Sequence, residues 1–592
     1  MLKKNYIAVL LLSGISALCF TNTKMPAREK RVTAGIIKQA DSFFNFTAHV
    51  FLPAVQHNAG AKKLRALFIQ ARLLYKKFEW AAEYFTPAAA RLINGAPVPS
   101  FDGGMITTPQ GLQVAETMIY PVWDATQKQA LVQQLKLICN ARDELLAYFK
   151  NIDILDWQVF DAVKLEVFRI EILGIAGFDA PLAKNSMAEA ACSINSMQQV
   201  IKLYSNTAVV NTVFCNAGQY LEQHPSFDSF DRAAFIKIYA DPITSAVTIL
   251  ANTMHIKGVQ YSRLLRQDAT TLFDTGAFDV TAYAPGIPYS PSSRQILLGE
   301  KLFNDPVLSG SGNRSCAFCH DPAKNFTDGL VKNISVDGRT ILPRNTPTLL
   351  NAALQPFQFY DMRVTTLEAQ VTDVVQSHTE MNGSLDSAAV RLWRNNTYRQ
   401  LFAEAFSQNG RSGIDTFEIT HAIAEYIRSL SKLNSRFDRY MRGDLKALNN
   451  SEVAGFNLFM GKAKCGTCHF MPLFNGVIPP SYTNEEPEVI GVPADLDSKA
   501  IDTDTGVYKI IKAPFYLHAF KTPTLRNTAH TAPYMHNGAF AALKDVLNFY
   551  NAGGGTGRGI NVSNQTLAKD SLRLSNTDID NIIAFINSLS SN

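Results

Sequence analysis

Apolar residues in the N-terminal half of the chain recur at the spacing of an amphipathic α-helix. Between residues 62 and 92 they return every three or four positions, close to a period of 3.6. Similar patterns occur around 130–148, 157–173 and 188–204, whereas alternating strand patterns are absent. The region 32–265 is therefore predicted to be an all-helical domain.

The second half of the chain follows a segment rich in Pro, Gly and Ser at 284–293, and 266–294 is interpreted as a linker. Beyond it, two pairs of matched motifs indicate an internal duplication. They are Gly-x-x-Leu-Phe at 299–303 and 455–459, and Thr-Pro-Thr-Leu at 346–349 and 522–525. A leucine follows each Thr-Pro-Thr-Leu motif at the same distance, at Leu367 and Leu543.

The matched order of these motifs predicts two copies of one small helical unit, at 295–445 and 446–592. The boundary between them is placed after a predicted helix at 419–440. The chain is thus predicted to be all-α, with a helical bundle followed by two tandem units.

Composition narrows the functional classes. The chain has 592 residues, of which 46% are hydrophobic and 18% charged, and its net charge is +5. This composition excludes a disordered chain, and the absence of a basic block argues against nucleic acid as a partner. No apolar run reaches the roughly 18 residues that a membrane-spanning helix needs, so no transmembrane segment is expected in the mature chain.

The first residues have the layout of a secretory signal. Lys3 and Lys4 precede an apolar run at 7–20, which is followed by polar residues at 21–24. We predict a signal peptide at 1–22 and export to the periplasm, with a buried first helix as the alternative. Cys19 leaves lipid anchoring open.

The motif Cys-x-x-Cys-His occurs twice, at 316–320 and 465–469, which chance would produce in roughly one chain in a million. Two thiols at this spacing can each form a thioether with a haem vinyl group, and the adjacent His then lies under the iron. We predict two covalently bound haem c groups. Their attachment residues are Cys316 and Cys319 for haem 1 and Cys465 and Cys468 for haem 2, with His320 and His469 as axial iron ligands.

Two other interpretations of the cysteine pairs were weighed. A zinc ribbon would use Cys-x-x-Cys pairs as tetrahedral corners, but the long separation and the repeated His argue against it. A redox dithiol would be expected to occur once rather than twice. Cys139, Cys192 and Cys215 remain, and they allow one disulfide or free buried thiols.

The second half resembles the bacterial di-haem cytochrome c peroxidase family, which includes the MauG-type enzymes. Six motifs in family order carry the resemblance over about 285–592: the two haem motifs, Arg-Asn-Thr-Pro-Thr-Leu at 344–349, Phe-Tyr-Asp-Met-Arg at 359–363, His-Thr-Glu-Met at 378–381, and Thr-Leu-Arg-Asn at 524–527 followed by Ala-Pro-Tyr-Met-His-Asn-Gly at 532–538. The resemblance implies two cytochrome c-like domains. It also implies that hydrogen peroxide reacts at haem 1 and that haem 2 takes electrons from a cytochrome c or another small redox protein.

Three residues match family positions around the first haem. Glu380 matches the distal glutamate, which would move a proton from the near to the far oxygen of hydrogen peroxide. Gln370 matches a distal-pocket glutamine that could hydrogen-bond the peroxide. Tyr360 stands where a tryptophan between the haems is usual, and it is expected to relay electrons together with a proton.

The resemblance also implies a calcium ion between the haems, held by Asn345, Thr531 and Pro533. Two of these contacts would be backbone carbonyls, and oxygen ligands suit a hard cation.

The chain departs from the peroxidase pattern at both irons. No His occurs between Asp321 and Pro343, where many members carry a histidine that blocks haem 1, so an open sixth position is expected there. Tyr550 falls where peroxidases place an axial Met for haem 2 and MauG-type members place a Tyr. Tyr550 is therefore the expected ligand, with Met535 as its rival.

The N-terminal half weakly resembles the imelysin-type helical domain of exported bacterial proteins. Gly111-x-Gln113-x-x-Glu116 matches the family motif Gly-x-His-x-x-Glu, with Gln113 in the place of the histidine. An amide is a poor ligand for a transition metal, so a docking or dimerisation role is preferred, and a homodimer stays open.

The leading functional hypothesis is an exported di-haem peroxidase that reduces hydrogen peroxide to water. A MauG-like oxidase acting on a protein or small-molecule substrate is the first alternative, favoured by Tyr550 and the missing His. A non-catalytic di-haem electron-transfer protein is the second, and Glu380 and Gln370 in an open pocket argue against it.

Overall fold

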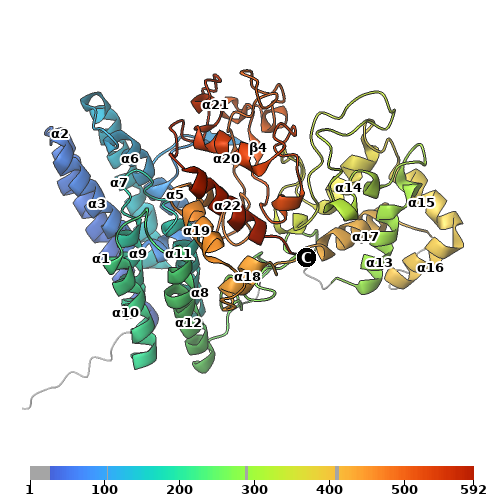
Figure 1. Cartoon of the computed structure of the whole chain (residues 1–592). Coiled ribbons are helices and arrows are strands. Elements are labelled where there is room, and N and C mark those ends of the chain that lie inside the picture. The colour runs from blue at the N-terminus through green and yellow to red at the C-terminus, as the bar shows by residue number, and fades with distance from the viewer. Residues whose placement is uncertain (1–26, 103, 260, 287–290, 407–412, 592) are drawn as a thin grey trace, which may run out of the picture.

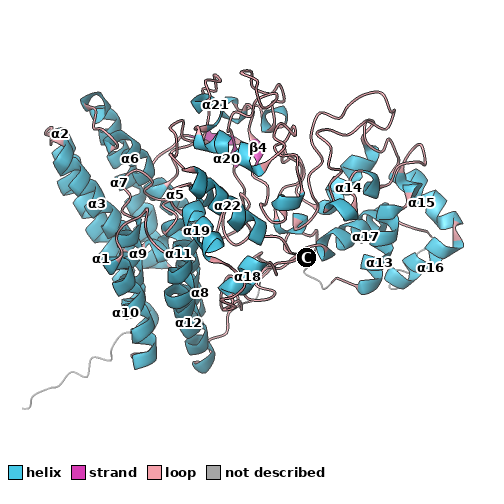
Figure 2. Cartoon of the chain, in the orientation of Figure 1, coloured by secondary structure: helices cyan, strands magenta, loops and turns pink. Residues whose placement is uncertain are grey.

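The computed structural model describes residues 27–591, apart from 103, 260, 287–290 and 407–412. Helices make up 53% of the chain (Figure 2), so the prediction of a mostly helical protein is confirmed. The pattern missed two short antiparallel strand pairs: β1 (Ser100–Asp102) with β2 (Met105–Thr107), and β3 (Pro487–Glu488) with β4 (Phe520–Lys521). The predicted signal peptide with Cys19 lies outside the described residues.

The N-terminal part consists of helices, several of which lie alongside one another (Figure 1). Its helices are α1 (Arg28–Phe46), α2 (Leu52–Gln56), α3 (Ala61–Lys76), α4 (Glu79–Phe85), α5 (Pro87–Asn94), α6 (Leu112–Ile119), α7 (Lys128–Asn151), α8 (Asp156–Arg169), α9 (Ser186–Ile201), α10 (Ala208–Gln223), α11 (Arg232–Phe235) and α12 (Asp241–Thr253), with a π-helical turn, η3 (Ile170–Gly174), after α8. The run at 62–92 is three helices rather than one. One break falls at Pro87, which lacks a backbone N–H and begins α5.

The first copy of the duplication contains α13 (Ser293–Asn304), α14 (Leu367–Gln376), α15 (Leu385–Arg394), α16 (Asn396–Ala405) and α17 (Thr416–Ser429). The second contains α18 (Arg436–Met441), α19 (Asn450–Met460), α20 (Leu543–Asn551), α21 (Gly554–Gly557) and α22 (Asn576–Ser588). The predicted helix at 419–440 is wrong in extent, because α17 ends at Ser429 and Ser435 caps a new helix through the backbone N–H of Asp438.

The two copies share one helix crossing. A Cβ at Gly299 on α13 would overlap the carbonyl oxygen of Ala422 on α17, and a Cβ at Gly455 on α19 would overlap that of Asn581 on α22. In each copy, therefore, a glycine at the same place in Gly-x-x-Leu-Phe allows the helix that carries the motif to touch the last helix backbone to backbone. The matched sequence motifs correspond to matched packing.

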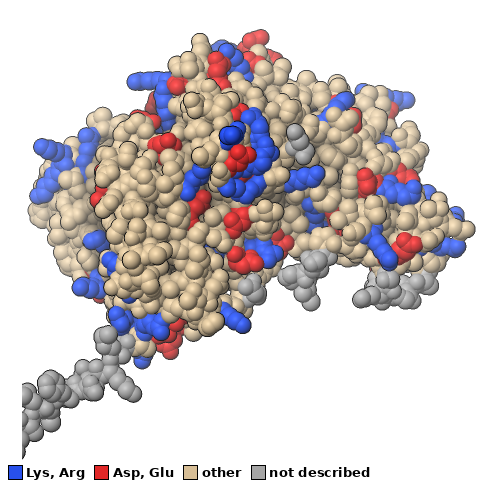
Figure 3. All heavy atoms as spheres, turned by 60° about the horizontal axis from the view of Figure 1, so that its bottom comes forward, with Lys and Arg blue, Asp and Glu red and all other residues tan. Residues whose placement is uncertain are grey.

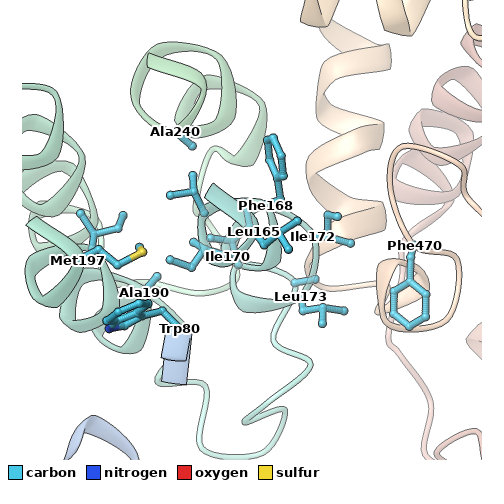
Figure 4. Close-up of a cluster of buried hydrophobic side chains, with 14 of the residues drawn as sticks. Trp80, Leu165, Phe168, Ile170, Ile172, Leu173, Ala190, Met197, Ala240 and Phe470 are labelled. Carbon is cyan, nitrogen blue, oxygen red and sulfur yellow. The ribbon is translucent and has the colours of Figure 1, made fainter. Parts of the chain in front are cut away.

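The hydrophobic cores do not follow the order of the chain. One core joins the N-terminal helices to the second copy, while the first copy has a separate core. In Figure 1 the second copy accordingly lies between the N-terminal helices and the first copy. Figure 4 shows part of the shared core, in which Phe470 lies on the side of Ile172 and Leu173 of η3; its ring centroid lies 5.9 Å from that of Phe178. Phe437 of α18 packs in this shared core, before the predicted boundary at 445.

One helical run in the described residues is long and apolar enough to cross a membrane. It spans Arg232–Thr253. Its most apolar 18-residue stretch has a mean hydropathy of 1.3, and 44% of that stretch is buried inside the protein. Core helices of soluble proteins pass the same test, so this run is weak evidence for a membrane span. On the face in Figure 3, basic and acidic side chains are interspersed over a largely uncharged surface.

The glycine crossing predicts a specific loss of stability. Gly299→Ala should lower the free energy of unfolding by about 2 kcal/mol, because a methyl group there overpacks a backbone contact. Gly35 on α1 has open space around its Cβ position, so Gly35→Ala is the matched control and should be neutral or slightly stabilising. Thermal unfolding of both variants measures the difference; equal midpoints would contradict the close approach.

Candidate functional site

A cavity lies at the junction of the two copies and receives residues from both. From the second copy it is lined by Cys465, Cys468 and His469, and from the first by Tyr360 and Gln370. The other predicted site residues on its wall are Tyr550, Met535, Asn345, Thr531 and Pro533. The structure thus brings together residues that the sequence spreads over two hundred positions.

The first haem motif begins in a short 3₁₀ helix, η6 (Cys316–Phe318), and the second in η9 (Cys465–Thr467). The imidazole Nδ1 of His320 donates to the carbonyl of Phe326 at 3.0 Å, and that of His469 donates to the carbonyl of Phe474 at 3.2 Å. Such a bond fixes the tautomer and leaves Nε2 as the metal-binding nitrogen. Both copies therefore hold their histidine in the same way.

Burial keeps both imidazoles neutral, which is the form that binds a metal. It lowers the pKa of His320 below its ordinary value and that of His469 to about 4. The carbonyls of Pro347 and Pro523 oppose this shift in the two copies. The repeated Thr-Pro-Thr-Leu motif thus places an equivalent carbonyl beside each histidine.

The cysteines of both motifs are free thiols, as are Cys139, Cys192 and Cys215. Burial raises the pKa of Cys316 and of Cys465 to about 12 each, so these thiols are neutral at physiological pH. Two unpaired thiols beside a histidine with a free Nε2 form the donor set for a covalently attached haem, and both copies provide it.

Glu380 is a half-buried carboxyl near the first motif. Burial raises its pKa above the ordinary value, against a hydrogen bond with Ser377. Its negative charge contributes to the pKa of Cys319, which burial raises to about 11. The carbonyl of Thr379 accepts bonds from Ser335 and Val336, which tie this segment to the loop after the first motif.

Gln370 and Tyr360 face the junction from the first copy. The side-chain oxygen of Gln370, on α14, is buried and has no hydrogen-bond partner among the described residues. Burial raises the pKa of Tyr360 well above its usual range, so the phenol keeps its proton. The Lys521 backbone N–H donates to the Tyr360 carbonyl at 2.9 Å, which fixes the tyrosine segment to β4.

Arg344 joins the two copies. Its guanidinium binds Asp361 of the first copy at 2.7 Å and Asp504 of the second at 2.6 Å. Burial alone would raise the pKa of Asp504, but the bonds from Arg344 and Lys509 lower it below the ordinary value. The adjacent Asn345 donates its backbone N–H to the carbonyl of His536 at 2.8 Å.

Tyr550, on α20, and Met535 both line the cavity, so position alone does not choose between them as ligands. Burial raises the pKa of Tyr550, and the nearby Cys468 and Cys465 add to this shift, which places its phenol beside the second motif. Glu488 lies there too; the Cys468 thiol donates to its carboxylate at 3.4 Å, and burial raises the pKa of Glu488 to about 7.

The three residues predicted to bind calcium all lie on the wall of the cavity. Asn345 Nδ2 donates to the carbonyl of Leu330 at 2.8 Å, and Thr531 and Pro533 share the cavity wall with it. Among the described residues, no three His, Cys, Asp or Glu side chains form a metal-binding group. A cation here would depend on amide, hydroxyl and backbone oxygens.

The side chains of the imelysin-like motif bind other residues of the N-terminal part. Gln113 Nε2 donates to the carbonyl of Asn94 at 2.9 Å. The Glu116 carboxylate accepts the backbone N–H groups of Leu182 and Ala183 at 3.1 and 2.7 Å. Both side chains are buried and bind neighbouring loops of the N-terminal helices, which supports a structural role for the motif.

Sequence reasoning missed Lys521. It is 8% exposed and lines the cavity, and its backbone holds Tyr360. A signal was present: Lys521 precedes the second Thr-Pro-Thr-Leu motif as Asn345 precedes the first, so the two copies differ in charge at this position.

This chain is similar to a known protein family, to several proteins in sequence and to solved structures. A family model for di-haem cytochrome c peroxidase matches residues 293–446. The methylamine utilization protein MauG of Methylophilus methylotrophus is 35% identical over 296 residues, which cover 49% of this chain and 81% of that protein. The cytochrome-c peroxidase IdrP1 of Pseudomonas sp. (strain SCT) is 33% identical over 361 residues, covering 56% of this chain and 93% of that protein.

The cytochrome c551 peroxidase of Pseudomonas aeruginosa is 31% identical over 327 residues, covering 55% of this chain and 86% of that protein. Among solved structures, a MauG-like protein associated with microbial copper homeostasis is 27% identical with a TM-score of 0.45, and the match covers 52% of this chain and 93% of that one.

Proposed function

Because the chain belongs to the bacterial di-haem cytochrome c peroxidase family, we propose that it is an exported peroxidase that reduces hydrogen peroxide to water. Its electrons would come from a cytochrome c or a similar small redox protein. One observation carries the proposal: both copies provide two free thiols and a histidine bonded at Nδ1, and a half-buried carboxyl, Glu380, stands at the first.

The family implies two c-type haems, and the donor sets at 316–320 and 465–469 fit them. Bound haem would supply the iron at which peroxide is cleaved and the electron-transfer capacity of the second copy. In this proposal 295–445 and 446–592 are cytochrome c-like domains, and 32–265 is a helical domain for docking or dimerisation.

Glu380 would act as the acid–base group. A carboxyl whose pKa is raised by burial can take a proton from the near oxygen of hydrogen peroxide and return it to the far oxygen, so that water leaves. Gln370 would orient the peroxide, since its buried side-chain oxygen has no protein partner among the described residues.

Tyr360 would connect the two copies as an electron relay. It lines the shared cavity, and Arg344 and Lys521 fix its segment at the junction. Its buried phenol keeps its proton, so loss of an electron would also release a proton. A calcium ion bound by Asn345, Thr531 and Pro533 would brace the same junction.

A MauG-like oxidase acting on a protein or small-molecule substrate is the second candidate, because Tyr550 lies beside Cys468 on the wall of the cavity. A phenolate ligand favours ferric over ferrous iron, unlike the thioether of Met535. A purely electron-transferring role has less support, since the raised pKa of Glu380 and the unpartnered side-chain oxygen of Gln370 suit these two groups to act on peroxide.

Glu380→Gln tests the peroxidase proposal directly. The variant should keep its covalent haem but reduce peroxide at least about 100-fold more slowly, because the amide cannot exchange the proton. Steady-state assays with hydrogen peroxide and reduced c-type cytochromes measure the rate. Glu404, an exposed helical glutamate, provides the control Glu404→Gln, which should match the wild type. Near-normal turnover in Glu380→Gln would remove this residue from the mechanism.

Tyr550→Phe and Met535→Leu separate the two ligand assignments. If the phenolate binds haem 2, electron paramagnetic resonance of the diferric protein should show one high-spin and one low-spin haem. The low-spin signal should then disappear in Tyr550→Phe and persist in Met535→Leu. Loss of that signal in Met535→Leu alone would assign the ligand to Met535 and weaken the oxidase alternative.

A further inference from the structure

Lys521 places a buried ammonium at the junction of the two copies. Its side chain is 8% exposed, and Nζ donates to Gln355 Oε1 at 2.8 Å and to the carbonyl of Phe357 at 3.2 Å. Both acceptors are neutral, and both belong to the first copy. An ammonium buried among neutral acceptors is costly unless an anion balances its charge.

Glu485 is the acid whose charge acts on Lys521, but it does not provide that anion. Glu485 is 2% exposed, and neither of its carboxylate oxygens has a hydrogen-bond partner among the described residues, so it does not bond Lys521. Burial raises the pKa of Glu485 to about 8, which leaves it largely protonated at neutral pH. Burial in turn lowers the pKa of Lys521, and Glu485 opposes this shift.

The charge is also specific to the second copy. Asn345 holds the matching position in the first copy, and its amide bonds the carbonyl of Leu330. Lys521 instead lines the cavity that also contains Cys465, Cys468 and His469. A haem attached there would bring two carboxylate side chains into the same cavity.

We propose that Lys521 binds a carboxylate side chain of covalently attached haem and thereby supports the potential of that haem. This inference rests on the proposed function in one respect: it requires that haem is attached to the chain. The ammonium would form a charge-assisted bond inside the protein, where such bonds are stronger than in water. Lys521 would thus act through the cofactor and not on peroxide.

The test compares haem-loaded Lys521→Gln and Lys521→Arg with the wild type. Covalent haem content is measured first, and then the midpoint potentials of both haems between pH 5 and pH 9. In Lys521→Gln the potential of haem 2, the haem of the motif in this cavity, should fall, because an unneutralised carboxylate favours ferric iron. Its pH-dependent region should move up by about one to three pH units, the usual effect of losing an opposite charge. Lys521→Arg keeps the charge and should retain the wild-type profile.

Three further variants exclude other causes. Gln355→Ala removes one of the two bonds from the Lys521 ammonium to the first copy but keeps the charge, so it should keep the wild-type profile. Glu485→Gln should also keep it, since Glu485 is the acid whose charge acts on Lys521. Besides the residues of the second motif, the titratable groups on the cavity wall are Tyr360, Lys464, Glu488, Tyr534, His536 and Tyr550, and all of them are unchanged in this variant. Lys462 lies near the second motif but pairs with Asp578 at the surface. Lys462→Gln is therefore the charge-matched control and should change neither the haem potentials nor their pH dependence.

An unchanged profile in haem-loaded Lys521→Gln would overturn the inference and leave the proposed function standing. If Gln355→Ala reproduces the change, Lys521 serves only the contact between the copies. If Glu485→Gln abolishes the pH dependence, the titrating group is Glu485 and not a haem carboxylate. A wild-type protein without covalent haem would overturn both the inference and the proposed function.

Discussion

The double ion pair of Arg344 is the contact on which the haem-bearing half depends. One guanidinium binds Asp361 and Asp504, so a carboxylate from each copy is held at a single point. The partly buried guanidinium stabilises the fold only while both carboxylates stay in place, because a lone charge in the protein interior is strongly disfavoured. The cavity between the copies, the Tyr360 segment and the Asn345 contact to His536 all lie next to this point.

Much of the site could be predicted because its chemistry is encoded locally. Cys-x-x-Cys-His specifies the thiols and the imidazole within five residues, and the structure holds both histidines alike. Helix ends were less predictable, since hydrophobic period alone does not show the cap at Ser435 or the start at Pro87. Lys521 was missed because a lone lysine beside a motif is usually solvated, and only packing of the other copy buries it.

The domain organisation could be predicted only in part, for a different reason. The Pro/Gly/Ser segment at 284–293 marks where the chain changes character, but the core that starts in the N-terminal helices continues in the second copy. Contacts such as Phe178 with Phe470 join residues nearly three hundred positions apart, and no local pattern reports them. Fully buried Arg232 strengthens the same interface, because it lies against Gly461 and donates to the carbonyls of Ile175, Phe227 and Phe230.

This interface bears on how the protein is made. Phe318, between the cysteines of the first motif, is 49% exposed, whereas its counterpart Thr467 in the second motif is half-buried, and η3 of the N-terminal part packs against η9. An assembly enzyme that joins haem to cysteine can reach the first motif in a folded chain. The N-terminal helices cover part of the second motif, so access to it would be better before these helices dock. Haem attachment at the second motif would therefore depend on the order in which the parts of the chain fold.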